Sequence, residues 1–270
     1  MEATMKNVLV LMHDDAGQEA RFQAALDLTR GLEGHLRCVD IAMVPAYVGD
    51  YIEFGGGAAL LADEQTREAA NRVRMEGRLK AEDVPYDWVD ATGFARECLR
   101  DATALADLVV LNRELDKIDY PDMRDLICDT ILKTGKPIVA VPEKTLGFDL
   151  YGHAVVAWDG SRTAEAALQA TVSLLKHAGT VTILVVDEGA LRLPAAEAAE
   201  YLSRHGIRPE VRVVPKTDTV GGAILGVVEA LKAAYLVMGG FGHSRFLEAA
   251  FGGVTRRMLA ESPVPLLLAH

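Results

Sequence analysis

The sequence predicts an α/β protein made of two tandem open, mostly parallel five-stranded sheets with helices on both faces. Three observations carry this prediction. The chain of 270 residues is long enough for two domains of roughly 100–150 residues each. Short apolar runs rich in Val, Ile and Leu alternate with helical patterns, as β-α-β units require. The apolar runs of the first half recur, in the same order, in the second half.

The internal repeat consists of four pairs of matching segments. Offsets of 147, 147, 127 and 128 relate residues 7–11 to 154–158, 36–41 to 183–187, 106–111 to 233–238, and 137–140 to 265–268. The offset falls by about 20 residues between the second and third pairs, so the first copy carries an insertion within residues 43–83. We therefore expect one domain over residues 1–143, a linker over 144–153 and a second domain over 154–270.

The second copy shows the order of the elements most clearly. A strand over 154–158 precedes Asp159-Gly160-Ser161, which is a turn and helix N-cap signal. A helical stripe follows, made of Ala164, Ala167, Leu168, Thr171, Leu174 and Leu175. We expect the remaining elements as a strand over 183–187, a helix over 194–206, a strand over 210–214, a helix over 220–231, a strand over 235–238, a helix over 251–261 and a strand over 264–269.

The charge of the chain is strongly asymmetric. Residues 1–150 carry 28 acidic and 17 basic side chains, whereas residues 151–270 carry 11 of each, so the net charge of −11 lies wholly in the first half. Neutralising nucleic-acid phosphates needs clustered Lys and Arg, so this composition argues against nucleic acid as a partner. For an anionic ligand, the same electrostatics favours the second half.

The chain shows no signal for a membrane or a secreted location. No apolar run approaches the roughly 20 residues of a membrane-spanning helix, and the first residues lack the apolar core of a secretory signal. None of Cys38, Cys98 and Cys128 stands in a C-x-x-C pair, which fits a reducing cytosol. We expect a cytoplasmic protein without membrane contact, disulfide framework or zinc site.

A glycine-rich stretch follows the strand over 235–238. It reads Met238-Gly239-Gly240-Phe241-Gly242-His243-Ser244-Arg245, and the next helix is preceded by Phe251-Gly252-Gly253-Val254-Thr255-Arg256-Arg257. In open α/β sheets the ligand crevice lies beyond the carboxyl ends of the strands, where glycines let backbone N–H groups approach phosphate oxygens. A helix N-terminus favours an anion, to which His243, Arg245 and Arg256 can add charge or hydrogen bonds. The alternative is that the glycines only form tight turns.

The spacing of these glycines resembles the nucleotide loop of the universal stress protein family. Gly239, Gly242 and Gly252 match its pattern, a G-x-x-G followed by nine residues and another glycine. The family pattern ends in Gly-Ser or Gly-Thr, whereas this chain has Gly253, for which Thr255 is a partial substitute. The resemblance covers the whole second copy and, more weakly, the first. It implies a tandem member of the family with the Rossmann-like, adenine-nucleotide-binding type of fold.

The resemblance implies a stress-response protein that binds ATP, or another adenine nucleotide such as AMP, with Mg²⁺ at the phosphates. Asp159 and Val185 match the family positions that hold the adenine and ribose end. For Asp159, a purely structural role as turn and helix cap is an equal alternative. The contact set expected from the resemblance is Ala157, Asp159, Val185, Met238, Gly239, Gly242, His243, Arg245, Gly252, Gly253, Val254 and Thr255.

The first copy lacks the glycines of the second, so we expect one nucleotide site per chain. Asn112 stands at the position of Gly239 and Leu115 at that of Gly242. The same loop contains Asp116, Asp119, Asp122 and Asp125, which would repel a triphosphate. The family resemblance also implies pairing of the two domains through their last strands, 137–141 and 264–269, and a homodimer is a further possibility.

The sequence specifies no catalytic nucleophile and no residue that positions an attacking water, so slow ATP hydrolysis is the most that we expect. The alternative function is a nucleotide-independent scaffold or interaction protein. His13 with Asp14 and Asp15 fits a turn and helix cap better than a metal site, and we expect no metal centre. We interpret residues 55–57 as a flexible loop, 66–82 as a partly exposed or partner-docking helix, and Gly221, Gly222 and Gly226 as helix-packing glycines.

Overall fold

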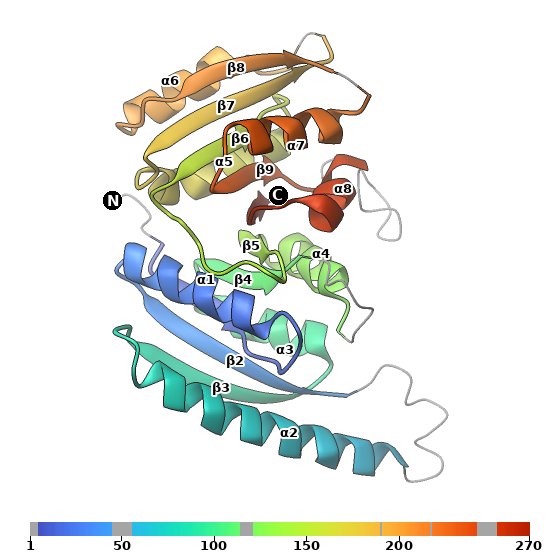
Figure 1. The fold of residues 1–270 in the computed structure, drawn as a ribbon. Coiled ribbons are helices and arrows are strands. Elements are labelled where there is room, and N and C mark those ends of the chain that lie inside the picture. Colours follow the sequence, from blue (N-terminus) through green and yellow to red (C-terminus); the bar gives the residue numbers. More distant parts are fainter. Residues whose placement is uncertain (1–4, 45–55, 114–120, 190, 217, 242–252) are drawn as a thin grey trace.

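A single ten-stranded sheet runs through the chain in the computed structural model, which describes residues 5–44, 56–113, 121–189, 191–216, 218–241 and 253–270 (Figure 1). The strand order is β3-β2-β1-β4-β5-β10-β9-β6-β7-β8. The elements are β1 (Asn7–Leu11), α1 (Gln18–Gly31), β2 (His35–Met43), α2 (Gly56–Leu79), β3 (Tyr86–Gly93), α3 (Ala95–Ala102), a 3-10 turn (Thr103–Leu105), β4 (Leu108–Asn112), α4 (Met123–Thr134), β5 (Ile138–Val141), β6 (His153–Ala157), α5 (Arg162–Leu175), β7 (Thr180–Asp187), α6 (Ala195–Arg204), β8 (Glu210–Pro215), α7 (Val220–Ala230), β9 (Tyr235–Gly239), α8 (Gly253–Glu261) and β10 (Leu266–Ala269).

The predicted α/β class is confirmed, but the two predicted five-stranded sheets form one. Strands β5 and β10 pair antiparallel, with Val139 opposite Leu267, and all other neighbouring strands are parallel. The predicted meeting of segments 137–141 and 264–269 is therefore confirmed. An unpaired strand edge exposes N–H and C=O groups, and pairing within the chain satisfies both edges at once. The division into domains and the formation of a homodimer stay predictions.

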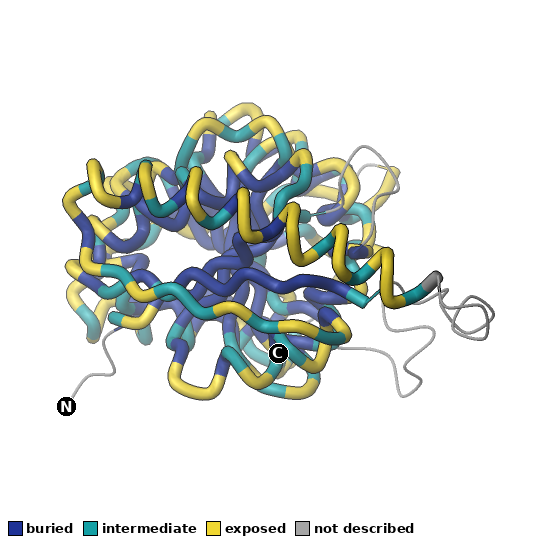
Figure 2. Tube along the Cα trace, turned by 90° about the horizontal axis from the view of Figure 1, so that it is seen from below, coloured by how far each residue is buried: buried dark blue, intermediate teal, exposed yellow. Residues whose placement is uncertain are grey.

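The sheet is covered by two helical layers, each with four helices among the described residues. Phe22 of α1, Met75 of α2, Leu168 of α5 and Leu202 of α6 belong to one buried cluster. Leu99 of α3, Ile127 of α4, Ile224 of α7 and Met258 of α8 belong to the other, on the opposite face. Figure 2 shows α2 in front with an exposed outer side, and the buried strands behind it. The sheet therefore presents its strand ends, rather than its faces, to a ligand.

The strand register corrects the predicted repeat offsets in the first two strands. Val8 pairs with Leu36 and Leu108, whereas Ala154 pairs with Val181 and Tyr235, which gives offsets of 146 for the first strand and 145 for the second. An offset of 147 for the first strand would exchange its two faces, because side chains alternate along a strand. The offsets of 127 and 128 are confirmed by the register of the other strands. His13 is thus the counterpart of Asp159, and Asp40 of Val185.

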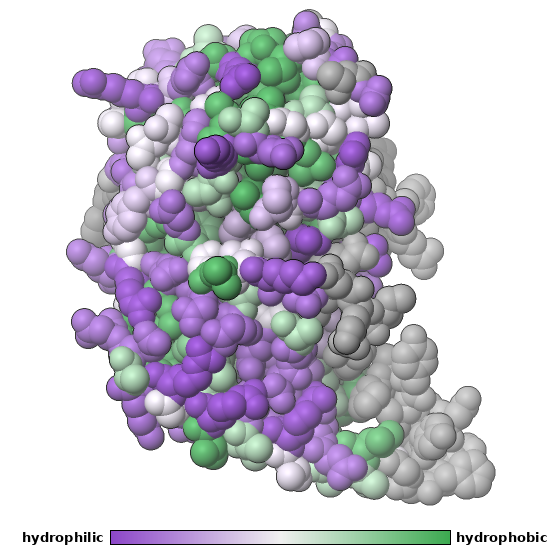
Figure 3. Space-filling model, in the orientation of Figure 1, coloured by the Kyte–Doolittle hydropathy of each residue, from purple (hydrophilic) through white to green (hydrophobic). Residues whose placement is uncertain are grey.

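The insertion in the first copy forms α2, which contains most of the predicted helix over 66–82. It buries Met75 and Leu79 against the sheet and carries charged side chains on its outer side. Figure 3 shows the corresponding lower half of the molecule as mostly hydrophilic. The predicted flexible loop over 55–57 is wrong for residues 56 and 57, which begin this helix. Residue 55 lies outside the described residues.

The segment between β5 and β6 packs against both halves. Phe148 and Leu150 are buried, and the Phe148 ring centroid lies 4.9 Å from that of Tyr235 in β9. The Phe148 N–H donates to Asp27 Oδ2 of α1 over 2.9 Å. The predicted linker ended at His153, which is instead the first residue of β6. Within the described residues, no helix is both long and apolar enough to cross a membrane.

Candidate functional site

A cavity of about 370 Å³ lies at the carboxyl ends of β6, β7 and β9 in the second half. The N-terminal turns of α5, α7 and α8 surround it. Its lining consists of Ala157, Trp158, Asp159, Thr163, Ala164, Leu184, Val186, Glu188, Val220, Ile224, Met238, Gly239, Gly253, Val254 and Thr255. This is the place where open α/β sheets hold small ligands, and the volume lies within the roughly 300–1,000 Å³ of typical ligand pockets.

Seven of the predicted contact residues line this cavity. They are Ala157, Asp159, Met238, Gly239, Gly253, Val254 and Thr255. Val185 does not line it, because its side chain is buried on the other face of the sheet, beneath α5 and α6. Its neighbours Leu184 and Val186 point into the cavity instead. Gly242, His243, Arg245 and Gly252 lie outside the described residues.

The Asp159-Gly160-Ser161 turn has both a structural role and a place at the cavity. Asp159 Oδ1 accepts the Ser161 N–H over 2.9 Å, and Ser161 Oγ accepts the Ala164 N–H over 3.2 Å, which caps α5. Gly160 has a φ of +69°, and a Cβ on it would lie 2.6 Å from the Leu193 carbonyl oxygen. The Trp158 indole N–H donates to the same oxygen over 3.0 Å. These contacts hold the Asp159 carboxylate at the cavity edge.

Gly239 allows α5 to approach the end of β9 closely. A Cβ at this position would lie 2.4 Å from the Thr163 carbonyl carbon and 2.5 Å from the Ala164 nitrogen. Backbone atoms cannot move aside without moving the helix, so any side chain here would displace the first turn of α5. This glycine therefore has a packing role in addition to the role predicted for it.

The first turn of α8 borders the cavity, because Gly253, Val254 and Thr255 belong to its lining. Gly253 is the first residue of the helix, and no heavy atom of the described residues lies within 4 Å of the position where its Cβ would be. The first N–H groups of a helix have no partner within it and carry its positive dipole end, so this turn is suited to an anion. Thr255 is 5% exposed at the same turn.

The basic residues of α8 point away from the cavity. Arg257 donates to Thr219 Oγ1 over 2.5 Å and to Glu261 Oε2 over 2.9 Å. A Cβ on Gly221 would lie 2.9 Å from Arg257 Cδ, so the predicted helix-packing role is confirmed for this glycine. The same prediction is wrong for Gly226, which is exposed and has no described heavy atom within 4 Å of its Cβ position. Arg256 is exposed and does not line the cavity. The charged side chains that do line it are Asp159 and Glu188, and Glu188 pairs with Lys216 over 2.6 Å.

In the first half, the position of Gly239 is taken by Asn112, and polar side chains fill the junction. Asn112 and Arg21 are fully buried, and the Arg21 guanidinium donates to Asn112 Oδ1. It also donates to the Leu11 carbonyl oxygen over 2.9 Å, to the His13 carbonyl oxygen over 2.8 Å and to Asp15 Oδ1 over 2.9 Å. A guanidinium with these partners occupies the space beside the ends of β1 and β4.

The other residues considered from the sequence have structural partners. Asp15 Oδ1 accepts the Gly17 N–H over 2.8 Å, as expected for a turn before α1, and Asp14 pairs with Arg74 over 2.7 Å. These two carboxylates therefore have cationic partners and do not share a site with His13. Burial raises the pKa of all three cysteine thiols, which keeps them protonated and unreactive at neutral pH.

Comparison with known proteins finds a family match in the second half and a similar fold for the whole chain. Residues 186–270 match the sequence profile of the universal stress protein family. A universal stress protein of Synechocystis is 28% identical over 185 residues, which span 65% of this chain and 62% of that relative. The structure of a universal stress protein from Archaeoglobus fulgidus has a TM-score of 0.74 at 16% identity and covers 97% of this chain and 95% of its own. A functionally unknown protein from Pseudomonas aeruginosa has a TM-score of 0.63 at 14% identity, with coverages of 98% and 92%.

The strand order, the two helical layers and the cavity beyond the carboxyl ends of the strands define a tandem α/β protein of the Rossmann-like class. The profile match and the Synechocystis relative narrow the class of protein further. Residues 186–270 carry the sequence signature of the universal stress protein family, and the whole chain has the fold of a solved member of that family.

Proposed function

We propose that the second half binds an adenine nucleotide, with ATP as the first candidate, and that the protein acts as a sensor or regulatory module in a stress response. The observation that carries the proposal is the position of the α8 N-terminus, which borders a cavity of nucleotide size and is the end of a helix that favours an anion. The net charge of zero over residues 151–270 also favours an anion there over the acidic first half.

The cavity walls suit the two ends of such a ligand. Leu184, Val186 and Ile224 provide an aliphatic lining for a purine, and the Asp159 carboxylate can accept from its exocyclic amine. The role expected for Val185 thus passes to Val186. The phosphates, with Mg²⁺, would face Gly253–Thr255, and the segment containing Gly242, His243, Arg245 and Gly252 connects β9 to that turn along the chain.

We propose binding rather than fast turnover. Among the described lining residues, Asp159 and Glu188 are the only carboxylates, one bonded to the turn it begins and the other paired with Lys216. In the proposed orientation Asp159 faces the adenine rather than the phosphates and Glu188 is paired with Lys216, so hydrolysis would be slow at most. The second candidate function, a nucleotide-independent scaffold, is favoured by Gly253, because the hydroxyl of the family pattern is missing there.

Two substitutions at Gly253 test the phosphate position. Both are expected to fold, because a Cβ there meets no heavy atom of the part of the chain that the structure describes within 4 Å. Gly253→Ser adds a hydroxyl at the α8 N-terminus and is expected to tighten Mg-ATP binding about fivefold, equivalent to one hydrogen bond of about 1 kcal/mol. Gly253→Val adds bulk without a donor and is expected to weaken binding by at least that factor.

The measurement is calorimetric titration of nucleotide-free protein with Mg-ATP, with an expected stoichiometry of one per chain. Gly226→Ala, on the exposed side of α7, is the control and should leave the dissociation constant unchanged. Equal affinities for the Ser and Val variants would contradict the phosphate position. No saturable binding at millimolar Mg-ATP would favour the scaffold function.

Base selectivity separates the two roles of Asp159. We expect the wild-type chain to prefer ATP over GTP about tenfold, or about 1.4 kcal/mol, because the carboxylate accepts from the adenine amine. Asp159→Asn keeps an oxygen for the Ser161 N–H but adds an amide donor where an acceptor is needed, so this preference should disappear. An unchanged ATP to GTP ratio in the Asn variant would restrict Asp159 to the turn.

A further inference from the structure

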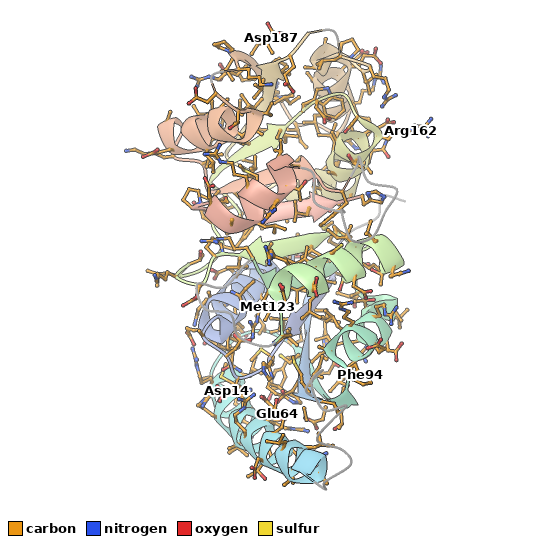
Figure 4. All side chains as sticks on the ribbon, turned by 90° about the vertical axis from the view of Figure 1, so that its right-hand side faces the viewer. Asp14, Glu64, Phe94, Met123, Arg162 and Asp187 are labelled. Atoms are coloured by element: carbon orange, nitrogen blue, oxygen red, sulfur yellow. The ribbon has the colours of Figure 1, made fainter. Side chains whose placement is uncertain are left out.

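A second buried polar cluster lies at the carboxyl edge of the first half, beneath α2. His13 follows β1, while Glu64 and Glu68 lie one turn apart on α2; Figure 4 labels Asp14 and Glu64 beside this helix. The His13 Nδ1 atom is 2.9 Å from Glu68 Oε1 and 3.8 Å from Glu64 Oε1. One ligand atom from each of the three residues lies within 4.8 Å of the others. His13 and Glu68 are only 2% and 5% exposed.

Asp40 of β2 brings another carboxyl group to this cluster from the strand beside β1. It is 2% exposed, and neither of its carboxyl oxygens has a hydrogen-bond donor among the described residues. The carboxyl faces Glu68. Buried polar atoms without partners are uncommon, and two acid groups face each other favourably only when a proton or a cation lies between them.

The fold itself does not require an acid at this position. The counterpart of Asp40 in the second half is Val185, which is buried beneath α5 and α6 and has no polar group. The same strand therefore packs well with an aliphatic residue. Burying the Asp40 carboxylate is costly, and valine is sufficient for packing at this position. The burial therefore indicates that the charge of Asp40 has a partner.

Asn71 holds the Glu68 carboxylate in place, whereas Arg67 lies over the cluster with a half-exposed side chain. Asn71 Nδ2 donates to Glu68 Oε2 over 3.1 Å and to the Met12 carbonyl oxygen over 2.6 Å. Arg67 Nη2 lies 2.9 Å from Glu64 Oε1 and 3.3 Å from His13 Nε2. The Arg67 side chain is 48% exposed, so it can turn into solvent when another cation takes its place.

We propose that His13, Glu64 and Glu68 bind one divalent transition-metal ion of the Zn²⁺ or Mn²⁺ type, with Asp40 as a further carboxylate ligand. Bonds of about 2.0–2.1 Å in a tetrahedron place ligand atoms roughly 3.3 Å apart, and the separations of 2.9 and 3.8 Å bracket this value. A mixed imidazole and carboxylate set suits these ions better than Mg²⁺ or Ca²⁺. Binding of the metal at Nδ1 leaves the ring proton on Nε2. Arg67 is also a donor, so it can no longer donate a hydrogen bond to that nitrogen and must move away from it.

The ion would join three parts of the first half that are far apart in sequence. Its ligands come from the end of β1, from the middle of β2 and from two turns of α2. The negative charge of residues 1–150 would attract a cation to this half. The site is separate from the proposed nucleotide cavity, and it can be tested without any nucleotide.

The test is calorimetric titration of the chelator-treated full chain with ZnCl₂ and, separately, MnCl₂. We expect one ion per chain, at least tenfold weaker binding in His13→Gln and in Glu68→Gln, and a melting temperature that rises with metal in the wild type only. The matched control is His35→Gln, which alters a half-exposed pair with 2.7 Å between His35 Nε2 and Asp87 Oδ1. Unchanged affinity in His13→Gln, or no saturable binding below 1 mM metal, would overturn the proposal.

A measurement on the wild-type chain keeps the test valid if a variant fails to fold. X-ray absorption of the zinc-loaded chain should show nitrogen and oxygen ligands only. A sulfur ligand would overturn the proposal, because Cys38, Cys98 and Cys128 are the competing zinc ligands. Asp40→Asn should weaken zinc binding while leaving the circular dichroism spectrum unchanged, and unchanged affinity would exclude Asp40 from the ligand set.

Discussion

Replacing Arg21 by methionine is expected to destabilise the chain by about 3–5 kcal/mol, the usual cost of removing one partner from a buried ionic network. The guanidinium has no exposed surface and donates to four acceptors in the first half. Methionine fills most of the volume but donates no hydrogen bond. The Leu11 and His13 carbonyl oxygens, the Asn112 amide and the Asp15 carboxylate would lose this donor in a site closed to water.

Urea unfolding followed by far-ultraviolet circular dichroism measures this effect. Arg30→Met is the control, because Arg30 is also on α1 and also ion-paired, with Asp27 and Glu82, but its side chain is 39% exposed. Surface ion pairs contribute about 0–1 kcal/mol, so the control should lose no more than that. A similar small loss for both variants would show that the Arg21 network contributes little to the stability of the first half.

The sequence was sufficient for the architecture because two kinds of pattern agree. Alternating strand and helix patterns predict the class, and the repeat predicts that the class occurs twice. The sequence was insufficient for the register between the strands of the two copies, because short runs of Val, Leu and Ala align almost equally well at neighbouring offsets. Only the pairing of Val8 with Leu36 and Leu108 fixes which face each side chain takes. Val185, which the family resemblance implied as a contact, lies one position from Val186, the residue that lines the cavity, and side chains at adjacent positions of a strand face opposite sides of the sheet.

The polar features of the first half were beyond sequence reasoning for a different reason. Arg21 lies in a helix with charged neighbours, where an arginine is ordinarily exposed. His13, Asp40 and Glu68 come from three separate segments, and no spacing rule links them. The acids of α2 were interpreted as a solvated helix surface, because helical periodicity does not show which strand the helix crosses. Tertiary contacts, rather than local pattern, determine both groups.

Gly239→Ala is expected to destabilise the chain by about 2–3 kcal/mol, toward the upper end of overpacking costs. The added Cβ would lie 2.4 Å from the Thr163 carbonyl carbon, well inside contact distance, and both atoms belong to regular elements. The first turn of α5 must then move away from β9. Because Thr163, Ala164 and Asp159 line the cavity from that side, the same movement should weaken Mg-ATP binding at least tenfold.

Gly226→Ala is the matched control, since it adds the same methyl group inside α7 at a position with no heavy atom of the described segments within 4 Å. It should stabilise the chain by up to about 1 kcal/mol through helix propensity alone. Denaturant unfolding of both variants, with and without Mg-ATP, separates packing from ligand contact. If Gly239→Ala proves neutral in stability but loses nucleotide affinity, the glycine is needed for the ligand rather than for α5. Loss of both together would mean that the junction of α5 with β9 builds the site, which is the arrangement that Asn112 and Arg21 replace in the first half.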